Sequence, residues 1–154
     1  DLFVSLHCNG WFSERATGVE TYFLSPAKTD RDASVARDEN LAAEGGGDDL
    51  EFILWDLVQN RFITDSSELA EAVQAALCRA LGAENRGVKQ AGFRVLVGAY
   101  MPAVLVEMGF LSNGEEEKRL TDPDHQRLLA RTIGEAILEY RDRHSAAPEE
   151  EGRP

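Results

Sequence analysis

A short apolar run over residues 101–110 constrains the fold of this chain more than any other segment. The run is rich in β-branched residues, and its length predicts a strand that is buried on both faces. Strands of this kind belong to sheets that are covered by helices. Ligands of open α/β sheets bind outside the carboxyl ends of the strands. We therefore expect Glu107, which closes the apolar part of the run, to lie at a strand end and to face a crevice.

The first residues of the chain repeat this arrangement. An apolar run over residues 2–6 ends on His7, and Cys8, Asn9 and Gly10 follow. If the two strands are parallel, His7 and Glu107 meet at one edge of the sheet. A histidine beside a glutamate is the start of a metal site or of an acid/base site.

The rest of the pattern predicts an α/β fold with a mixed, mostly parallel sheet and helices on both faces. Residues 19–24 and 93–97 have high β-propensity, and we expect strands there. Helical spacing and capping signals predict the remaining elements. We expect helices over residues 30–44, over 50–58, from Thr64 to a stop at Gly82, over 115–120, and from Asp122 and Pro123 onward.

The 154 residues are enough for one domain with a proper core. We expect this domain over residues 1–144, followed by a disordered acidic tail over residues 145–154 that has nothing to bury. The chain opens on Asp1 and runs directly into a strand. We therefore expect that the domain lacks its first strand-helix-strand portion in this chain.

Charge and composition exclude several classes of partner. The formal net charge of -12 and the absence of a basic stripe argue against a nucleic-acid partner. The sequence contains no apolar run of the roughly 20 residues that span a bilayer. Cys8 and Cys78 are too few for a disulfide framework, and we expect no bridge between them.

Each candidate has alternative interpretations. Taken singly, His7 and Glu107 can be structural residues that hydrogen-bond at strand ends. Cys8 could act as a nucleophile with His7 or His125 as its base, but neighbours on a strand point to opposite faces. We expect Cys8 to be a small buried residue, and His125 and His144 to be solvated. Glu20 alternates with apolar residues and is interpreted as a solvent-side or cross-strand partner.

The strand-end residues belong to longer motifs that resemble a known family. The matching segments are DLFVSLHCN (1–9), GVETYFLS (18–25), ENLA (39–42), SELA (67–70), RGVKQAGFRVL (86–96) and MPAVLVEMGFLSN (101–113). They fall in family order, and the resemblance runs from Asp1 to about Tyr140. On these motifs the chain resembles the zinc-dependent N-acetylmuramoyl-L-alanine amidases of the Amidase_3 family, which includes AmiC-like enzymes.

The resemblance implies a peptidoglycan hydrolase that cleaves the amide between N-acetylmuramic acid and the L-alanine of the stem peptide. It implies one Zn²⁺, with His7 as a ligand and Glu107 as the catalytic general base. It further implies a role in cell-wall remodelling, as in autolysins, at an extracytoplasmic location such as the periplasm or the cell envelope. The partner is then peptidoglycan, and any activator protein is unknown.

This chain departs from the family pattern at the metal site. The resemblance implies that two further zinc ligands of the family, a histidine and a glutamate, match positions upstream of Asp1. We therefore expect this chain to hold one zinc ligand and the general base, and not to build the full site or to be active by itself. The alternative interpretation is therefore a non-catalytic relic of the same fold that binds peptidoglycan or regulates its hydrolysis. A cysteine hydrolase is the third possibility, and it predicts sensitivity to alkylation of Cys8 rather than to chelation.

Overall fold

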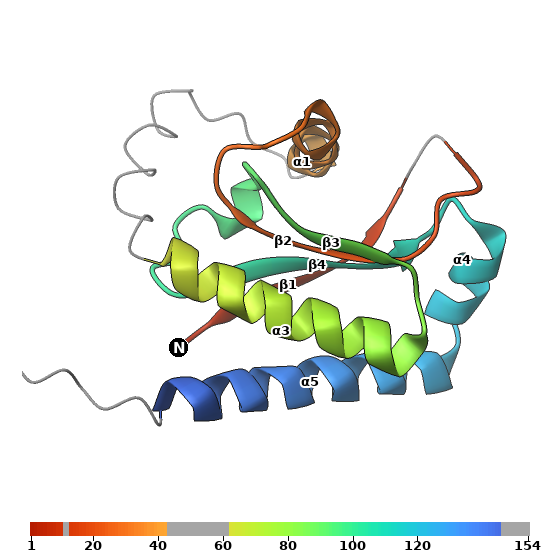
Figure 1. The fold of residues 1–154 in the computed structure, drawn as a ribbon. Helices are drawn as coiled ribbons and strands as arrows, with labels where there is room; N and C mark the ends of the chain where they lie inside the picture. Colours follow the sequence, from red (N-terminus) through yellow and green to blue (C-terminus); the bar gives the residue numbers. More distant parts are fainter. Residues whose placement is uncertain (11–12, 43–61, 146–154) are drawn as a thin grey trace, which may run out of the picture.

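The molecule is built on a mixed four-stranded sheet with the strand order β1-β4-β2-β3 (Figure 1). A computed structural model of the chain describes residues 1–10, 13–42 and 62–145. The strands are β1 (Phe3–Asn9), β2 (Val19–Leu24), β3 (Asn85–Ala91) and β4 (Ala103–Phe110). β1 pairs with β4 and β2 with β3 in parallel, whereas β2 and β4 are antiparallel. The mixed, mostly parallel sheet predicted from the sequence is confirmed.

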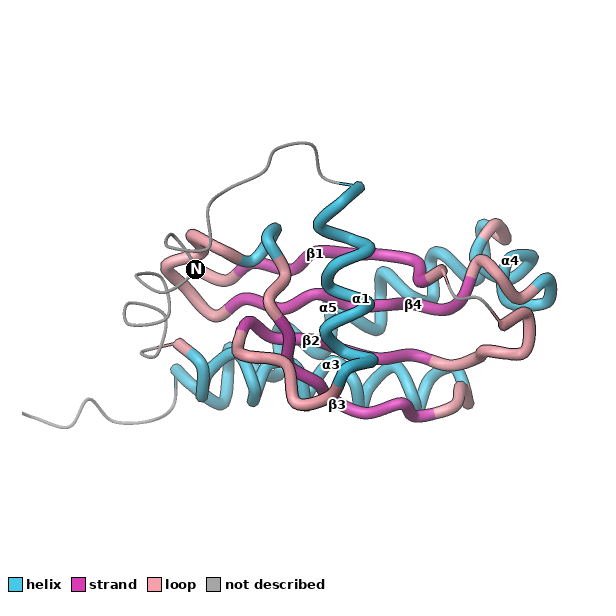
Figure 2. Tube along the Cα trace, turned by 90° about the horizontal axis from the view of Figure 1, so that it is seen from above, coloured by secondary structure: helices cyan, strands magenta, loops and turns pink. Residues whose placement is uncertain are grey.

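Helices cover both faces of this sheet, as the sequence predicts. The long helices α3 (Ile63–Leu81) and α5 (Pro123–Ser145) pack on one face. Helix α1 (Asp30–Ala42) lies on the other face and crosses the strands from β3 towards β1 (Figure 2). The short helix α4 (Gly114–Leu120) follows β4 directly. No helix within the described ranges is both long and apolar enough to cross a membrane.

The core is divided between the two faces because successive residues of a strand point to opposite sides. On β4, Val104 and Val106 pack with α3 and α5, whereas Leu105 packs on the α1 side. All three side chains are fully buried. The same alternation directs Glu107 to the α1 side of the sheet, beside Leu105 and away from α3 and α5.

Capping residues end and begin the helices where the sequence predicts. Gly82 follows α3 in the left-handed conformation, with φ of 59°, and its N–H donates to the carbonyl of Cys78. The side chain of Asn113 accepts from the first N–H groups of α4. Asp122 does the same at the start of α5, where Asp124 and His125 donate to its carboxylate. These bonds satisfy donors that have no partner inside a helix.

The strand predicted over residues 93–97 is wrong. The third strand is β3, and the predicted segment forms a short 3₁₀ helix, η1 (Arg94–Leu96). Asn40 of α1 explains the difference, because its amide donates to the carbonyl of Gly92 and accepts from the N–H of Arg94, at 2.9 and 2.7 Å. Phe93 packs edge to face on Tyr22, with ring centroids 4.8 Å apart. The apolar residues of this segment thus anchor a turn in the core rather than a strand.

Some predicted elements lie outside the residues that the structure describes. The helix over residues 50–58, the last residues of the 30–44 helix and the tail from residue 146 lie outside the described residues. Helix α5 extends to Ser145, one residue beyond the expected domain boundary. The domain boundary and the missing first portion stay predictions.

Candidate metal centre

The parallel pairing of β1 and β4 places His7 and Glu107 side by side. They are direct partners in the register of the two strands, so their side chains share the α1 face. The predicted meeting of these two residues is confirmed. The expectation that each closes its strand is wrong, because β1 continues to Asn9 and β4 to Phe110. The pair therefore lies within the sheet and beneath α1.

Glu39 of α1 completes the group. One of its carboxylate oxygens lies 2.8 Å from Nδ1 of His7, and both side chains are partly exposed. The other ring nitrogen of His7, Nε2, lies 2.9 Å from the hydroxyl of Ser5, which fixes the orientation of the ring. Glu39 lies in the ENLA motif (39–42), but the sequence alone indicates no chemical role for it. Its position depends on long-range contacts of its neighbour Asn40, which anchors this end of α1 over the sheet.

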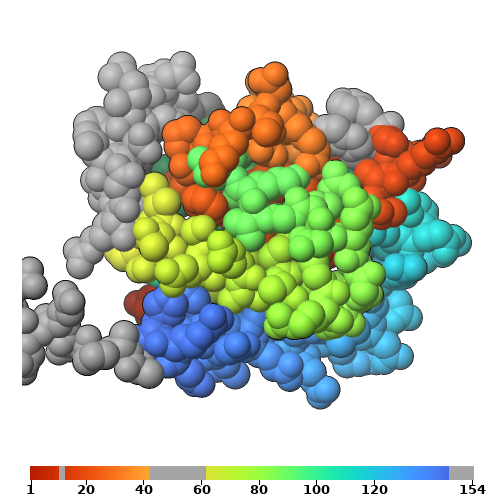
Figure 3. Space-filling model, viewed as in Figure 1, coloured from red at the N-terminus to blue at the C-terminus, as the bar shows by residue number. Residues whose placement is uncertain are grey.

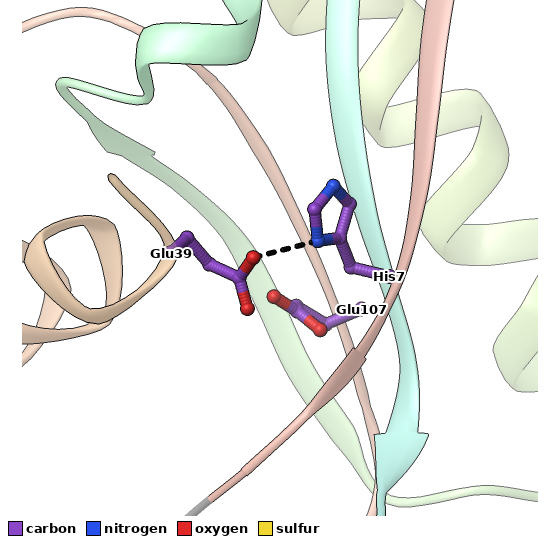
Figure 4. A group of neighbouring side chains, drawn as sticks. All are labelled: His7, Glu39 and Glu107. Atoms are coloured by element: carbon purple, nitrogen blue, oxygen red, sulfur yellow. Dashed lines mark ion pairs between the residues drawn. The ribbon is translucent and has the colours of Figure 1, made fainter. Parts of the chain in front are cut away.

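The three side chains form a group that could hold a metal ion. One ligand atom from each of His7, Glu39 and Glu107 lies within 4.8 Å of the others. The two carboxylates approach each other beside the imidazole ring, as Figure 4 shows. Ligand atoms in a tetrahedral zinc site lie roughly 3.3 Å apart, so small side-chain rotations would close the group around an ion. Imidazole nitrogen and carboxylate oxygen are both common zinc ligands.

Glu107 is the member of this group that most needs a charged or hydrogen-bonding partner. Its side chain is fully buried, and neither carboxylate oxygen has a hydrogen-bond partner among the described residues. Burial, together with the neighbouring charges of Glu39 and Glu20, raises the pKa of Glu107 from 4.5 to about 8. A buried carboxylate normally requires a paired charge or hydrogen bonds. The residues present therefore fit a bound cation at this position.

Glu20 of β2 lies directly opposite Glu107 in the antiparallel pairing of β2 with β4. It is also fully buried, but Arg31, Arg86 and Lys89 all donate to its carboxylate. Although burial raises the pKa of Glu20, the hydrogen bond and charge of Lys89 and those of Arg31 outweigh it, and the pKa is lowered. Of the two interpretations from the sequence, the solvent-side one is wrong and the cross-strand one is confirmed. Asn9 and Tyr22 donate to the same carboxylate.

The other candidates from the sequence lie apart from this group. Cys8 is only partly buried, where the sequence predicts a buried residue. It packs against the core on the α3 and α5 face, whereas His7 faces α1. Burial and the charge of Glu107 raise the pKa of the Cys8 thiol, which disfavours the nucleophilic thiolate. Cys8 and Cys78 are free thiols, as expected.

His125 and His144 are also remote from the candidate centre. His125 is half-buried, so it is less solvated than the sequence predicts. His144 is exposed, as expected, and its ring contacts the carboxylate of Glu68 at 2.9 Å and the carbonyl of Tyr140 at 2.8 Å. Neither histidine supplies a further ligand to the group around His7.

Comparison with known proteins supports this description. The profile of the Amidase_3 family, described as N-acetylmuramoyl-L-alanine amidase, matches residues 1–139. The chain is 31% identical over 148 residues to the N-acetylmuramoyl-L-alanine amidase AmiC of Escherichia coli O6:H1, with 91% of this chain and 36% of AmiC covered.

Two solved structures have the same fold. The N-acetylmuramoyl-L-alanine amidase from Clostridium difficile 630 is 27% identical, with a TM-score of 0.63, and the match covers 92% of this chain and 58% of that one. The CwlD amidase of Clostridioides difficile, solved in complex with the GerS lipoprotein, is 26% identical with a TM-score of 0.61, covering 92% and 54%. This chain thus spans between about a third and three fifths of the length of these relatives. The profile match over most of the chain, together with the shared fold, shows that the chain belongs to the N-acetylmuramoyl-L-alanine amidase family Amidase_3.

Proposed function

We propose that this chain is part of a zinc-dependent peptidoglycan amidase. The bond cleaved joins the lactyl group of N-acetylmuramic acid to the L-alanine of the stem peptide. One observation carries the proposal: within a family of amidases, the fold brings His7, Glu39 and Glu107 within 4.8 Å of one another. Because the substrate is a cell-wall polymer, the proposal includes an extracytoplasmic location.

The side chains divide into metal-holding and proton-carrying groups. His7 would hold zinc through Nδ1, and the Glu39 carboxylate, 2.8 Å from that nitrogen, offers a second ligand. When bound, zinc supplies a Lewis acid that polarises the amide carbonyl and lowers the pKa of water. Ser5 positions the imidazole through its hydrogen bond to Nε2, as outer-shell partners of ligating histidines do.

Glu107 is the proposed general base. It takes a proton from the attacking water and delivers that proton to the nitrogen of the leaving amine. Its burial and its lack of hydrogen bonds among the described residues leave both oxygens available for this transfer. A base works best when its pKa is near the working pH, and burial with the charges of Glu39 and Glu20 raises the pKa of Glu107 from 4.5 to about 8.

The likeness to CwlD adds a partner to the proposal. CwlD was solved with the GerS lipoprotein. We extend to this chain the idea that a second protein binds and regulates the amidase, without naming it.

Hydrolysis of purified peptidoglycan tests the proposal. The zinc-loaded protein is expected to release stem peptides with a free L-alanine amino group. Glu107→Gln should lower the rate by about 100-fold or more, because a general base contributes that much. Glu117→Gln on α4, which removes an exposed carboxylate, is the matched control and should retain activity.

Two results would contradict the proposal. Equal rates for the protein and for Glu107→Gln would remove Glu107 from the chemistry. Binding to peptidoglycan without any release of peptide would favour the non-catalytic relic instead.

A further inference from the structure

A cavity beside the candidate metal centre has a charge opposite to that of the protein. It has a volume of about 540 Å³ and lies where the N-terminal half of α1 meets β2 and β3. Figure 3 shows α1, in orange, against β3, in green, on the viewed face. Its lining includes four cationic side chains, Lys28, Arg31, Arg86 and Lys89, and one carboxylate, Asp32.

Positive charge is in excess at this cavity even after the carboxylates that pair with its cations are counted. Glu20 lies behind the cavity, and its single carboxylate accepts from Arg31, Arg86 and Lys89. Lys89 also approaches Asp32 at 3.9 Å. Arg86 also pairs with Glu84 at 3.6 Å. Among the described residues, four cations therefore face three carboxylates, in a chain whose formal net charge is -12. A local excess of one sign in a concave site attracts ligands of the other sign.

Glu20 also holds these cations in place before a ligand arrives. The carboxylate is fully buried, whereas the side chains of Arg31, Arg86 and Lys89 are 28%, 21% and 15% exposed. Their charged ends are thus fixed at the floor of the cavity while remaining accessible. Arg86 donates through Nε to Glu20 and through Nη1 to the carbonyl of Thr17, and a guanidinium has five donors in total. Fixed donors bind an anion with a smaller entropy cost than mobile ones.

The distance from the candidate metal centre suits one extended substrate. Arg31 and Glu39 lie on the same helix, eight residues apart, which corresponds to roughly 12 Å. An extended peptide covers about 3.4 Å per residue. A chain whose cleaved amide lies at His7 and Glu107 would therefore present its third or fourth residue to the cavity.

We propose that this cavity binds a carboxylate of the substrate's peptide and so selects acidic stem peptides. The identity of the substrate rests on the proposed function, but binding of a carboxylate to the cavity does not require turnover. Arginine and lysine side chains are the usual partners of carboxylates, and charge-assisted bonds are stronger than neutral ones. The simpler interpretation is that the cations only neutralise Glu20. Lys28, which is exposed and lines the cavity, distinguishes the two interpretations, because it makes no hydrogen bond or ion pair with Glu20 within the part of the chain that the structure describes.

Equilibrium binding to metal-free protein tests the proposal independently of catalysis. The probes are the tripeptide N-acetyl-L-alanyl-glycyl-glutamate, the same tripeptide with both carboxyl groups converted to amides, and inorganic phosphate, each titrated by calorimetry. We expect the acid to bind at least about tenfold more tightly than the diamide. Lys28→Glu should weaken binding of the acid by about tenfold and leave binding of the diamide unchanged, because it places a negative charge beside the bound carboxylate.

Lys118→Glu is the matched control, since it makes the same change of charge on α4, at an exposed position away from the cavity. It should alter the affinity for the acid less than twofold. Equal binding of acid and diamide would overturn the proposal. So would equal weakening by both variants, or no weakening by Lys28→Glu. Tighter binding of phosphate than of the acid would assign the cavity to phosphate-bearing ligands and overturn the carboxylate assignment. Loss of hydrolysis with retained acid binding would count against the proposed function alone.

Discussion

Glu107 and Glu20 are paired across β4 and β2, and both are fully buried, yet their surroundings differ completely. Glu20 has three cationic partners, and its pKa is lowered. Glu107 has no hydrogen-bond partner among the described residues, and its pKa is raised to about 8. The difference shows how one sheet supports two roles. The charge of Glu20 is fully used within the protein, whereas Glu107 remains available to a metal ion, a water molecule or a substrate.

The largest effect expected from this comparison concerns stability. Glu20→Gln removes the charge that three cations share, and breaking a buried ion pair costs about 3–5 kcal/mol. Glu107→Gln replaces a buried carboxyl group whose raised pKa makes the fold less stable at pH 7, so the free energy of unfolding should rise rather than fall. Urea denaturation of the metal-free proteins at pH 7 measures both. Equal losses would show that the two carboxylates are not in different environments.

A smaller effect should appear in the pH dependence of stability. The folded-state pKa of Glu107 is raised from 4.5 to about 8, so the folded metal-free protein holds a proton that the unfolded chain has released. The resulting stability is fully present below pH 4.5 and is lost as the pH rises towards about 8. The slope from this one group is at most about 1.4 kcal/mol per pH unit.

Glu20 has the opposite sign, because its pKa is lowered in the fold. Its contribution is present above its unfolded-state pKa and is lost as the pH falls. Comparing denaturation curves of the protein with those of Glu107→Gln between pH 5 and pH 8 isolates the contribution of Glu107 to the pH dependence of stability. If the two proteins lose stability in parallel over that range, the pKa of Glu107 is not raised.

The smallest effect is expected on the other face of the sheet. Cys8 neighbours His7 in sequence but packs with the core under α3 and α5. Cys8→Ala should therefore change peptidoglycan hydrolysis less than twofold, whereas a chelator should abolish it and added zinc should restore it. Loss of hydrolysis in Cys8→Ala, with no effect of the chelator, would instead support a cysteine hydrolase.

The sequence predicts the position of Glu107 beside His7 better than it predicts the surroundings of Glu39 and Glu20. Two apolar runs that lead to His7 and Glu107 are local signals, and parallel pairing is sufficient to bring the residues together. Glu39 was missed because its position depends on how α1 docks, which rests on contacts of Asn40 with residues 52 and 54 positions away. A carboxylate on a helix has no local mark that distinguishes it from a solvated one.

The same limit explains the errors in the fold. Residues 93–97 have the composition of a strand, but long-range contacts of Phe93 with Tyr22 and of Arg94 with Asn40 form a turn there. Glu20 alternates with apolar residues, which is also the pattern of a solvent-facing position on a one-sided sheet. Only the docking of α1 and the cations of β3 show that this position is buried.

The content of zinc per chain tests the central claim most directly. Purification in zinc-containing buffer, exhaustive dialysis and elemental analysis should give about one zinc per chain. Glu107→Gln should retain the metal because the proposed base is not required to hold it, and His144→Ala, remote from the centre, should also retain it. His7→Ala and Glu39→Gln should lose it. A protein that holds no zinc, or a His7→Ala variant that holds as much as the parent, would contradict the assignment of this metal centre.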